Sequence, residues 1–436
     1  MESDNTGSER GHWTPMRRTF LAGLGAATGA GALGGTAEAR STASPRQAGA
    51  VYHVVRRDDG DGGVQDYRVI DGETGSVVFM TDETADVAFQ FALEAVAGDG
   101  GTVVASADTF RFGAPVTVGD DTVLTGRGGT RLVASRTGTV DAVAPTDEQS
   151  DTLPTGHDLV RVRGDNVAVT DLEFDAAGTQ RANQAVQADG CENVLIANNR
   201  TVGGFQMGLS FTRCTGVTVA KNEVVDPNWY GITSRAAPTG SDLDLRQSSD
   251  VVVANNRVSG MKFNNIAPYN VSNFAVLGNV VFDGGHSLIA CSPSQQGTIV
   301  GNVCRGLAEF APDPGGEAGI EIEYKETHVR EAVKGTPRAR SYDITVAGNQ
   351  IDDCSVGFLA RTVPADDGDA ASRREDRPYA FSVTGNSISG SADAGIRIRS
   401  GEDAVVATNT VRDSGTDIDV AGDFTSGVQR GLNVRR

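Results

Sequence analysis

One short pattern recurs along this chain at a regular spacing and constrains the fold more than any other feature. Two apolar residues flank a single residue, and asparagine follows three positions later, as in Val194-x-Ile196-x-x-Asn199 and Val217-x-Val219-x-x-Asn222. The same asparagine recurs at 199, 222, 256, 279, 302, 349, 386 and 409, and several neighbours are 23 residues apart. A period of this length predicts a solenoid, in which each repeat forms one coil stacked on the last.

The residue types indicate three β-strands per coil. Alternating apolar residues predict a strand with one buried face, here just before the asparagine. A second apolar strand begins with glycine, as in Gly208-Leu209-x-Phe211 and Gly319-Ile320-x-Ile322, and a short third strand follows the asparagine. We expect the asparagine itself to take a left-handed bend, and its amide to bond the next asparagine from coil to coil.

This arrangement resembles the right-handed parallel β-helix of the pectin-lyase-like superfamily, over about residues 85–420. The resemblance implies an all-β solenoid whose open first coil is closed by a helix. Thr84 is placed to cap such a helix, which would bury one apolar face: Ala88, Phe89, Ala92, Leu93 and Val96. Because the superfamily holds lyases, hydrolases, epimerases and non-enzymes, the resemblance does not define an activity.

The amino terminus resembles a twin-arginine export signal. Arg17-Arg18-Thr19-Phe20-Leu21 precedes a weakly apolar run and then Ala37-Glu38-Ala39, a cleavage-like sequence. We therefore expect export of the folded protein to the cell surface or the medium, with no membrane-spanning segment. The predicted segments are a signal peptide (1–39), a polar lead-in with a hairpin near 67–80 (40–83), the β-helix (84–424) and a tail (425–436).

The charge excludes one class of partner. The formal net charge is −19, and only four of the 38 basic residues are lysines, which does not suit a nucleic-acid-binding surface. An acidic, lysine-poor chain is typical of proteins from salt-loving organisms, where carboxylates keep the surface hydrated. The five cysteines are expected to be small buried residues of the stack instead of a disulfide framework. We expect a monomer.

Departures from the 23-residue period mark insertions on one edge of the stack. The asparagine follows the Gly-Ile strand by 13 residues in regular coils, but by 24 after Ile232, 29 after Ile320 and 28 after Phe358. All three insertions leave the same turn. Loops that stack on one edge of a solenoid form a wall, and a wall beside a flat sheet predicts a groove.

Residues one and three positions after the Ile of each Gly-Ile strand should face this groove. In the early coils they are small and polar, whereas the later coils carry Glu321, Glu323, Arg361, Arg397 and Arg399. Tyr269 belongs to the same rows, and further polar or aromatic residues stand at the strand starts: Trp229, Tyr230, Asn264 and His286.

These residue types suit polysaccharide chemistry. Glu321 and Glu323, two apart on one strand face, fit the ~5–9.5 Å separation that glycoside hydrolysis requires of two carboxyl groups. Elimination or epimerisation of a uronate needs cations and a base, the base being Tyr230, Tyr269, His286 or His328. The predicted catalytic group is Glu321, Glu323, His286, Tyr269 and Arg361. The predicted substrate-binding group is Trp229, Tyr230, Arg235, Asn264, Lys325, Arg397 and Arg399.

Each of these assignments has a structural alternative. Glu323 with Arg361 could form a surface ion pair, Trp229 with Tyr230 could cover the following loop, and His286 could close a turn. Asp242-x-Asp244 could hold calcium, because oxygen ligands suit that ion; no other metal or cofactor is expected.

The function predicted from the sequence is binding, and cleavage or remodelling, of an acidic polysaccharide by a lyase, epimerase or hydrolase. Gly285-His286-Ser287 and Arg397-Ile398-Arg399 match the Gly-His-Gly and Arg-Ile-Lys segments of polygalacturonases only in part, so no catalytic role is carried over. The alternative is a non-enzymatic surface or periplasmic β-helix, such as an accessory protein of the NosD type or an adhesin.

Overall fold

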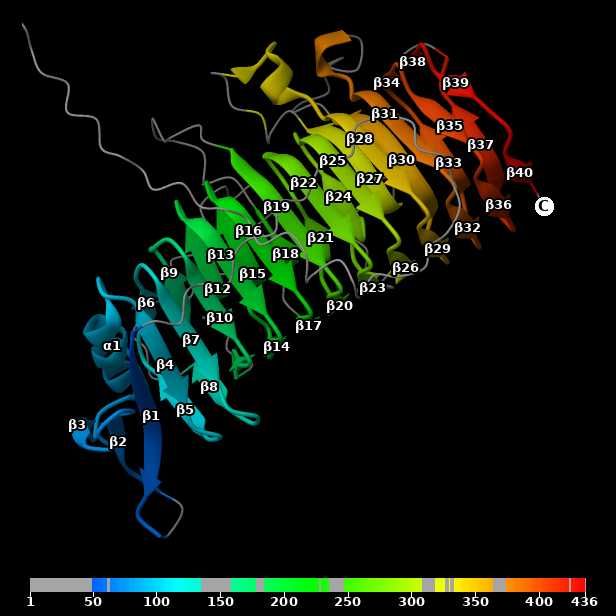
Figure 1. The fold of residues 1–436 in the computed structure, drawn as a ribbon. Helices are drawn as coiled ribbons and strands as arrows, with labels where there is room; N and C mark the ends of the chain where they lie inside the picture. Colours follow the sequence, from blue (N-terminus) through cyan, green and yellow to red (C-terminus); the bar gives the residue numbers. More distant parts are fainter. Residues whose placement is uncertain are drawn as a thin grey trace, which may run out of the picture.

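The computed structural model describes residues 49–60, 63–134, 158–177, 184–226, 229–234, 247–307, 318–325, 329, 333–363, 374–422 and 425–435. The predicted export signal lies outside these residues, as do Arg235, Asp242, Asp244 and His328. Within the described part the chain forms one elongated stack of coils, whose strands run side by side from the single helix to the C-terminal end (Figure 1).

Three sheets make up the three sides of the stack, one strand of each per coil, as the repeat predicts. Sheet A contains the Val-x-Val strands that precede each repeat asparagine, sheet B the short strands that follow it, and sheet C the Gly-Ile strands. Between coils, the pairing within all three sheets is parallel and in register, for example Val194↔Val217 in sheet A and Val186↔Leu209 in sheet C.

Sheet A consists of β1 (Ala50–Asp58), β2 (Val64–Asp71), β3 (Val77–Thr81), β4 (Gly101–Ala105), β7 (Thr122–Gly126), β10 (Val167–Thr170), β13 (Glu192–Ala197), β16 (Thr215–Ala220), β19 (Ser248–Ala254), β22 (Val271–Leu277), β25 (Gln295–Val300), β28 (Tyr342–Ala347), β31 (Tyr379–Thr384), β34 (Gly401–Glu402), β35 (Val405–Ala407), β38 (Thr425–Ser426) and β39 (Gln429–Arg430). Sheet B consists of β5 (Thr109–Phe112), β8 (Arg131–Ala134), β11 (Glu173–Asp175), β14 (Arg200–Val202), β17 (Glu223–Val225), β20 (Arg257–Ser259), β23 (Val280–Gly284), β26 (Val303–Leu307), β29 (Gln350–Asp352), β32 (Ser387–Ser389), β36 (Thr410–Arg412) and β40 (Val434–Arg435). Sheet C consists of β6 (Val116–Val118), β9 (Val160–Val162), β12 (Gln184–Asp189), β15 (Met207–Thr212), β18 (Tyr230–Thr233), β21 (Ile266–Ala267), β24 (Ile289–Cys291), β27 (Ala318–Lys325), β30 (Val356–Val363), β33 (Ala394–Ile398) and β37 (Thr416–Val420).

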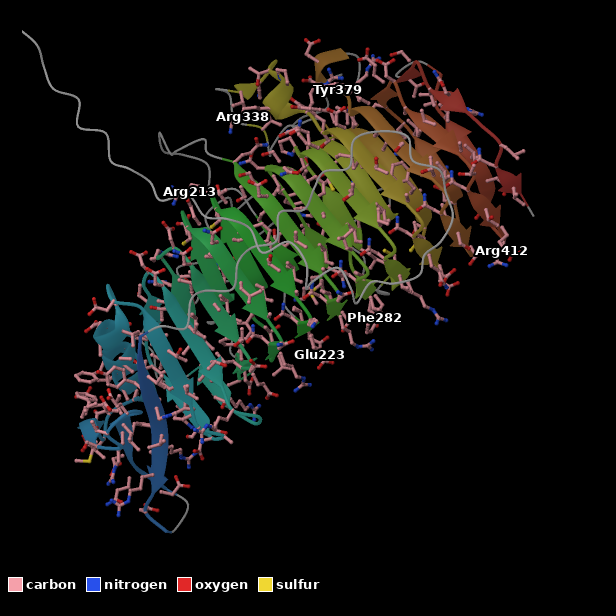
Figure 2. All side chains as sticks on the ribbon, viewed as in Figure 1. Arg213, Glu223, Phe282, Arg338, Tyr379 and Arg412 are labelled. Atoms are coloured by element: carbon pink, nitrogen blue, oxygen red, sulfur yellow. The ribbon has the colours of Figure 1, made fainter. Side chains whose placement is uncertain are left out.

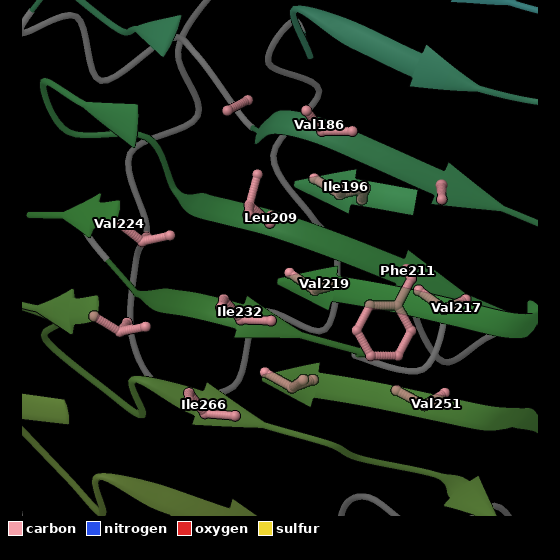
Figure 3. Packing of buried hydrophobic residues seen from close by; sticks show 14 of the residues in the cluster. Val186, Ile196, Leu209, Phe211, Val217, Val219, Val224, Ile232, Val251 and Ile266 are labelled. Atoms are coloured by element: carbon pink, nitrogen blue, oxygen red, sulfur yellow. The ribbon is translucent and has the colours of Figure 1, made fainter. Parts of the chain in front are cut away.

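The core fills the inside of the coils. Val, Ile, Leu and Phe side chains from successive coils lie one above the next, as Val186, Leu209, Ile232 and Ile266 do along sheet C (Figure 3). Because each coil repeats the same apolar positions, the core is continuous along the stack, and each added coil lengthens it.

A ladder of buried asparagines runs through one corner of the stack, as predicted. The Asn279 Oδ1 accepts hydrogen bonds from the backbone N and the Nδ2 of Asn256, at 2.9 and 3.0 Å. Its Nδ2 donates to the Asn302 Oδ1 and to the Val253 carbonyl oxygen, each at 2.9 Å. The same pattern links 199, 222, 256, 279, 302, 349, 386, 409 and 433.

The expected left-handed bend is wrong by one position. The residue before each ladder asparagine from 199 to 409 has the positive φ, for example Asn198 (57°), Asn255 (58°) and Gly278 (60°). The ladder asparagine turns its side chain inward, and the tight corner therefore falls on its neighbour, where glycine and asparagine are frequent.

The N-terminal end of the stack is closed by α1 (Ala85–Val96), whose expected apolar face is buried. Thr84 stands at the N-cap position, but its side chain makes no capping hydrogen bond, which corrects that detail of the prediction. The predicted hairpin is present as β2 and β3, and β1 joins it in an antiparallel meander while pairing in parallel with β4 of the first coil. At the other end, β38, β39 and β40 extend the stack past residue 424.

Among the described residues, no helix has the length and apolar character needed to cross a membrane.

Candidate functional site

The site is built on the outer face of sheet C, where β24, β27 and β30 lie side by side. The register pairs Ala290 with Glu321 and Glu321 with Leu359, and two positions further along it pairs Glu323 with Arg361. The two predicted rows of outward residues are therefore confirmed for these coils. Parallel strands in register bring such residues within ~5 Å of one another.

Glu321 is the centre of this group. Its side chain has no exposed surface, and its Oε1 accepts a hydrogen bond from the Arg361 Nε at 2.5 Å. The Ser287 hydroxyl donates to the Oε2 of Glu321, also at 2.5 Å. A guanidinium and a hydroxyl donor are the contacts that stabilise an ionised carboxylate in a dry environment.

Glu323 shares the same guanidinium at a longer distance, 3.9 Å from its Oε2 to the Arg361 Nη2. Burial, together with the charge of Glu321, raises the pKa of the Glu323 carboxyl to about 7, against the opposing effects of Lys325, Arg361 and Ser292. The predicted alternative of a surface ion pair is wrong, because both carboxylates are buried, at 0% and 2% exposure.

A hydrogen-bond chain links the aromatic residues to the carboxylates. The Tyr269 hydroxyl donates to the Asn264 Oδ1 at 3.0 Å, and the Asn264 Nδ2 lies 2.9 Å from the Ser287 carbonyl oxygen and 3.3 Å from the His286 Nδ1. That Nδ1 is 3.8 Å from the Oε2 of Glu321. The five residues of the predicted catalytic group and Asn264 from the predicted substrate-binding group thus form one buried polar cluster, which we call the outer cluster: Tyr269, Asn264, His286, Glu321, Glu323 and Arg361.

The aromatic rings beside it form a stack that follows the coils. Trp229 and Phe263 are parallel to within 4°, with centroids 4.7 Å apart, and Phe263 lies 6.1 Å from the His286 ring. Tyr230 and Tyr269 pack edge to face, 6.0 Å apart, in the same cluster. Because Trp229 and Phe263 occupy each other's ring faces, the Trp229 face turned toward Phe263 is not open to the substrate that Trp229 was predicted to bind.

The insertion after β27 returns to the same strand and packs on it. The Ser341 hydroxyl donates to the Glu323 carbonyl oxygen at 2.8 Å, and Tyr324 is buried with Val329 and Ala339, the last in the 3-10 helix η4 (Pro337–Ala339). Arg338 and Tyr379 mark this edge, which Figure 2 shows on the opposite side of the stack from Glu223 and Phe282. The carboxylates of the outer cluster are therefore buried beside this insertion. Much of the three insertions lies outside the described residues, so the groove stays a prediction.

The predicted cations Lys325, Arg397 and Arg399 differ in their surroundings and in their position relative to the outer cluster. Lys325 ends β27 and is partly buried, while Arg399 is exposed one coil beyond Arg361. Arg397 is engaged elsewhere, because it forms ion pairs with Asp393 and Asp419. Those partners explain why it does not point toward Glu321.

Two residues of the site escaped the sequence analysis. Phe263 lies between Trp229 and His286, and Ser287 donates to Glu321. Phe263 occupies the same position in its coil as Trp229, because its backbone N–H donates to the Trp229 carbonyl oxygen. An alignment of the coils at their strand starts would have found it.

The described ranges contain neither a metal-binding cluster nor a disulfide beside the site. Among the described residues, no group of three or more His, Cys, Asp and Glu side chains could hold a metal ion. All five cysteines are described; each is free and buried. The acidic pair at 242 and 244 lies outside the described residues, so the calcium prediction stays a prediction.

Comparisons with known proteins agree with the fold. Residues 158–332 match the family model described as right handed beta helix region. The A-module of a mannuronan C-5 epimerase from Azotobacter vinelandii superposes with a TM-score of 0.51 at 15% identity, over 81% of this chain and 96% of that one. An exopolygalacturonase from Thermotoga maritima gives 0.50 at 12% identity, over 81% and 88%.

A protein of another class is equally similar. The surface protein and adhesin PfbA from Streptococcus pneumoniae gives a TM-score of 0.51 at 14% identity, over 81% of this chain and 96% of that one. No curated protein sequence matches the chain. Identities this low establish the fold alone, and that fold is a right-handed parallel β-helix.

Proposed function

We propose that the protein binds an acidic polysaccharide along the outer face of sheet C and cleaves or remodels it by acid–base chemistry at Glu321 and Glu323. One observation carries the proposal: two buried carboxylates on the outer face share one guanidinium yet differ in environment. Burial of such a pair costs folding free energy. The apolar core lies on the other side of the sheet, so the fold itself does not require the two carboxylates at this place.

The difference between the two carboxyl groups assigns their roles. A pKa of about 7 lets Glu323 hold a proton near neutral pH and give it up, which suits a general acid or base. Glu321, held by Arg361 and Ser287, suits the carboxylate that stabilises positive charge or activates water. Two carboxyl groups with separate roles are the minimum that glycosidic bond cleavage requires.

The surrounding cations support an anionic polymer. Lys325 follows Glu323 on β27 and interacts with it electrostatically, and Arg399 is exposed one coil further on. In a chain with a net charge of −19, cations gathered at one face offer the countercharge that a uronate carboxylate needs. The names of two similar folds, a mannuronan epimerase and an exopolygalacturonase, point in the same direction.

The test is a panel of uronate polymers and neutral glucans, incubated with purified protein at high salt. Reducing ends report hydrolysis, absorbance of unsaturated products reports elimination, and exchange of sugar protons with deuterated water reports epimerisation. We expect one acidic polymer to be processed and Glu321→Gln to lower turnover by ~10²-fold or more, measured at a temperature where circular dichroism shows the variant to be folded.

A matched control comes from the same coil of the stack. Thr298 is partly buried on β25 of sheet A, away from the outer cluster, and Thr298→Ala should keep wild-type turnover. Equal turnover in the wild type, Thr298→Ala and Glu321→Gln would remove the outer cluster from the chemistry.

The complete burial of Glu321 favours a second candidate, a non-enzymatic carbohydrate-binding or adhesive β-helix. In that case the outer cluster only holds the insertion after β27 in place. Binding of a polymer that none of the three assays sees converted, with the same affinity in Glu321→Gln, would support the adhesive function.

We also propose export by the twin-arginine route and a monomeric state in solution. Replacement of both Arg17 and Arg18 by lysine should retain the protein in the cytoplasm, and sedimentation should give the mass of one chain. Unchanged export of the double variant would contradict the proposed route.

A further inference from the structure

The side-chain amide of Asn264 has only one orientation that satisfies its neighbours. The Ser287 carbonyl oxygen lies 2.9 Å from the Asn264 Nδ2, and a carbonyl oxygen can only accept a hydrogen bond. The amide nitrogen must therefore face Ser287, which leaves the Oδ1 to accept from the Tyr269 hydroxyl at 3.0 Å. Burial, with nearby negative groups, raises the pKa of Tyr269 well above its usual value, so this hydroxyl keeps its proton.

The orientation of Asn264 in turn determines what His286 can do. The same Nδ2 lies 3.3 Å from the His286 Nδ1, and an amide nitrogen offers only hydrogens. The Nδ1 must accept, so it carries no proton, and the proton of a neutral imidazole then resides on the Nε2.

Asn264 competes with Glu321 for this ring nitrogen. The Oε2 of Glu321 is 3.8 Å from the Nδ1, close enough to attract a proton there if Asn264 did not oppose it. A hydrogen on the Nδ1 would face a hydrogen of the amide at 3.3 Å, which is repulsive. Glu321 has stronger partners at 2.5 Å, Arg361 and Ser287, so the arrangement is stable without an imidazolium.

We propose that Asn264, held by Tyr269 and Ser287, is a positioning residue that fixes His286 as the neutral tautomer protonated on the Nε2. His286 is then not the base that removes a sugar proton. The role toward sugar rests on the proposed function, whereas the tautomer does not. Within the outer cluster, where Tyr269 keeps its proton and His286 is not the base, Glu323 and Glu321 are the proton-transfer groups.

Long-range 1H–15N correlation spectra of protein labelled in histidine test the tautomer without any substrate. Loss of one set of signals in His286→Gln assigns the ring, and His53 on β1, far from the site, serves as the internal reference. We expect the wild type to show an unprotonated Nδ1 and a protonated Nε2. In Asn264→Leu, the proton should move to the Nδ1 and face Glu321, or both ring nitrogens should become protonated.

Tyr269→Phe provides a second variant in case Asn264→Leu does not fold. It removes the donor to the Oδ1 but leaves the Ser287 carbonyl oxygen to hold the amide, so the His286 tautomer should persist. A wild-type spectrum with the Nδ1 protonated would overturn the proposal, and so would a tautomer unchanged in folded Asn264→Leu. If no polysaccharide were processed, the proposed function would fail, but the tautomer seen in these spectra would still decide the proposal about Asn264.

Discussion

The asparagine ladder and the outer cluster are both rows of buried polar groups, but they differ in repetition. The ladder places the same residue in the same bonds in every coil from Asn199 to Asn409. The outer cluster occurs once, and its residues change type from coil to coil: Ala290, Glu321, Leu359 along one row and Ser292, Glu323, Arg361 along the next.

Polar groups that recur in every coil stabilise the scaffold, whereas polar groups that occur in only one place serve another purpose. Each ladder amide has donors and acceptors above and below, so it is neutral, satisfied and necessary for stacking. The outer cluster concentrates charge at one place, where an apolar pair would have been less costly. In a solenoid, the polar group that breaks the repeat is therefore the candidate for function.

Removal of the shared guanidinium should have the largest effect. Arg361→Leu leaves Glu321 and Glu323 buried without their cation, and we expect a loss of ~3–5 kcal/mol of unfolding free energy. Arg397→Leu is the matched control: the two arginines have similar exposure, 11% and 12%, but the partners of Arg397 are exposed, at 56% and 44%. Its loss should stay near ~1 kcal/mol or less in denaturant titrations. Equal losses would show that burial of the partners does not matter.

The second largest effect is expected from Glu323, whose titration should make the unfolding free energy depend on pH. Its folded-state pKa is raised from 4.5 to about 7, so the stability it contributes is full below pH 4.5 and is lost as the pH rises to 7. Glu323→Gln removes that loss and should stabilise the protein by on the order of 3 kcal/mol at pH 8, but have little effect at pH 4. Thr298→Ala, which removes no titratable group, should show no such dependence. A constant difference between wild type and Glu323→Gln across this range would contradict the raised pKa.

A substitution in the asparagine ladder should change the unfolding free energy by the same amount at every pH. Asn279→Leu deprives the Asn256 amide groups of their acceptor and should cost ~1–3 kcal/mol at any pH. Asn433→Leu, at the partly buried last rung, should cost less, because water can replace the lost bonds. If the terminal variant cost as much as the central one, burial would not be the reason for the ladder's importance.

The smallest effects are expected on sheet B, where side chains of opposite charge lie beside one another on successive strands. Arg200 bridges Glu173 and Glu223, but these side chains are 29–47% exposed. Glu223→Gln should change the unfolding free energy by within ~0.5 kcal/mol, and added salt should reduce even that. A change above 1 kcal/mol would mean that exposed ion ladders stabilise this solenoid.

Much of this architecture is predictable from the sequence, because a repeat fixes its own register. The alternating valines before Asn222 and Asn256 define sheet A, and the ladder follows from their spacing. The same register brings Glu321, Glu323 and Arg361 together, although 36 residues separate Arg361 from the end of β27 at Lys325.

The sequence could not predict what depends on the insertions. Glu321 and Glu323 look exposed from their outward positions, yet they are buried, and the segment that reaches Glu323 through Ser341 has no repeat to indicate its path. The ion pairs of Arg397 were missed for a related reason, because Asp393 lies in a turn and Asp419 in the last full coil.

The central claim is that the outer cluster is the site of acid–base chemistry, and the pH dependence of turnover tests it most directly. On the polymer that the wild type processes, kcat/KM should fall as the pH rises through about 7, because Glu323 then loses its proton. Glu323→Gln should lower turnover by ~10²-fold or more and abolish this descending limb, while its stability at pH 8 rises. A Glu323→Gln variant with wild-type turnover and the same descending limb would contradict the account.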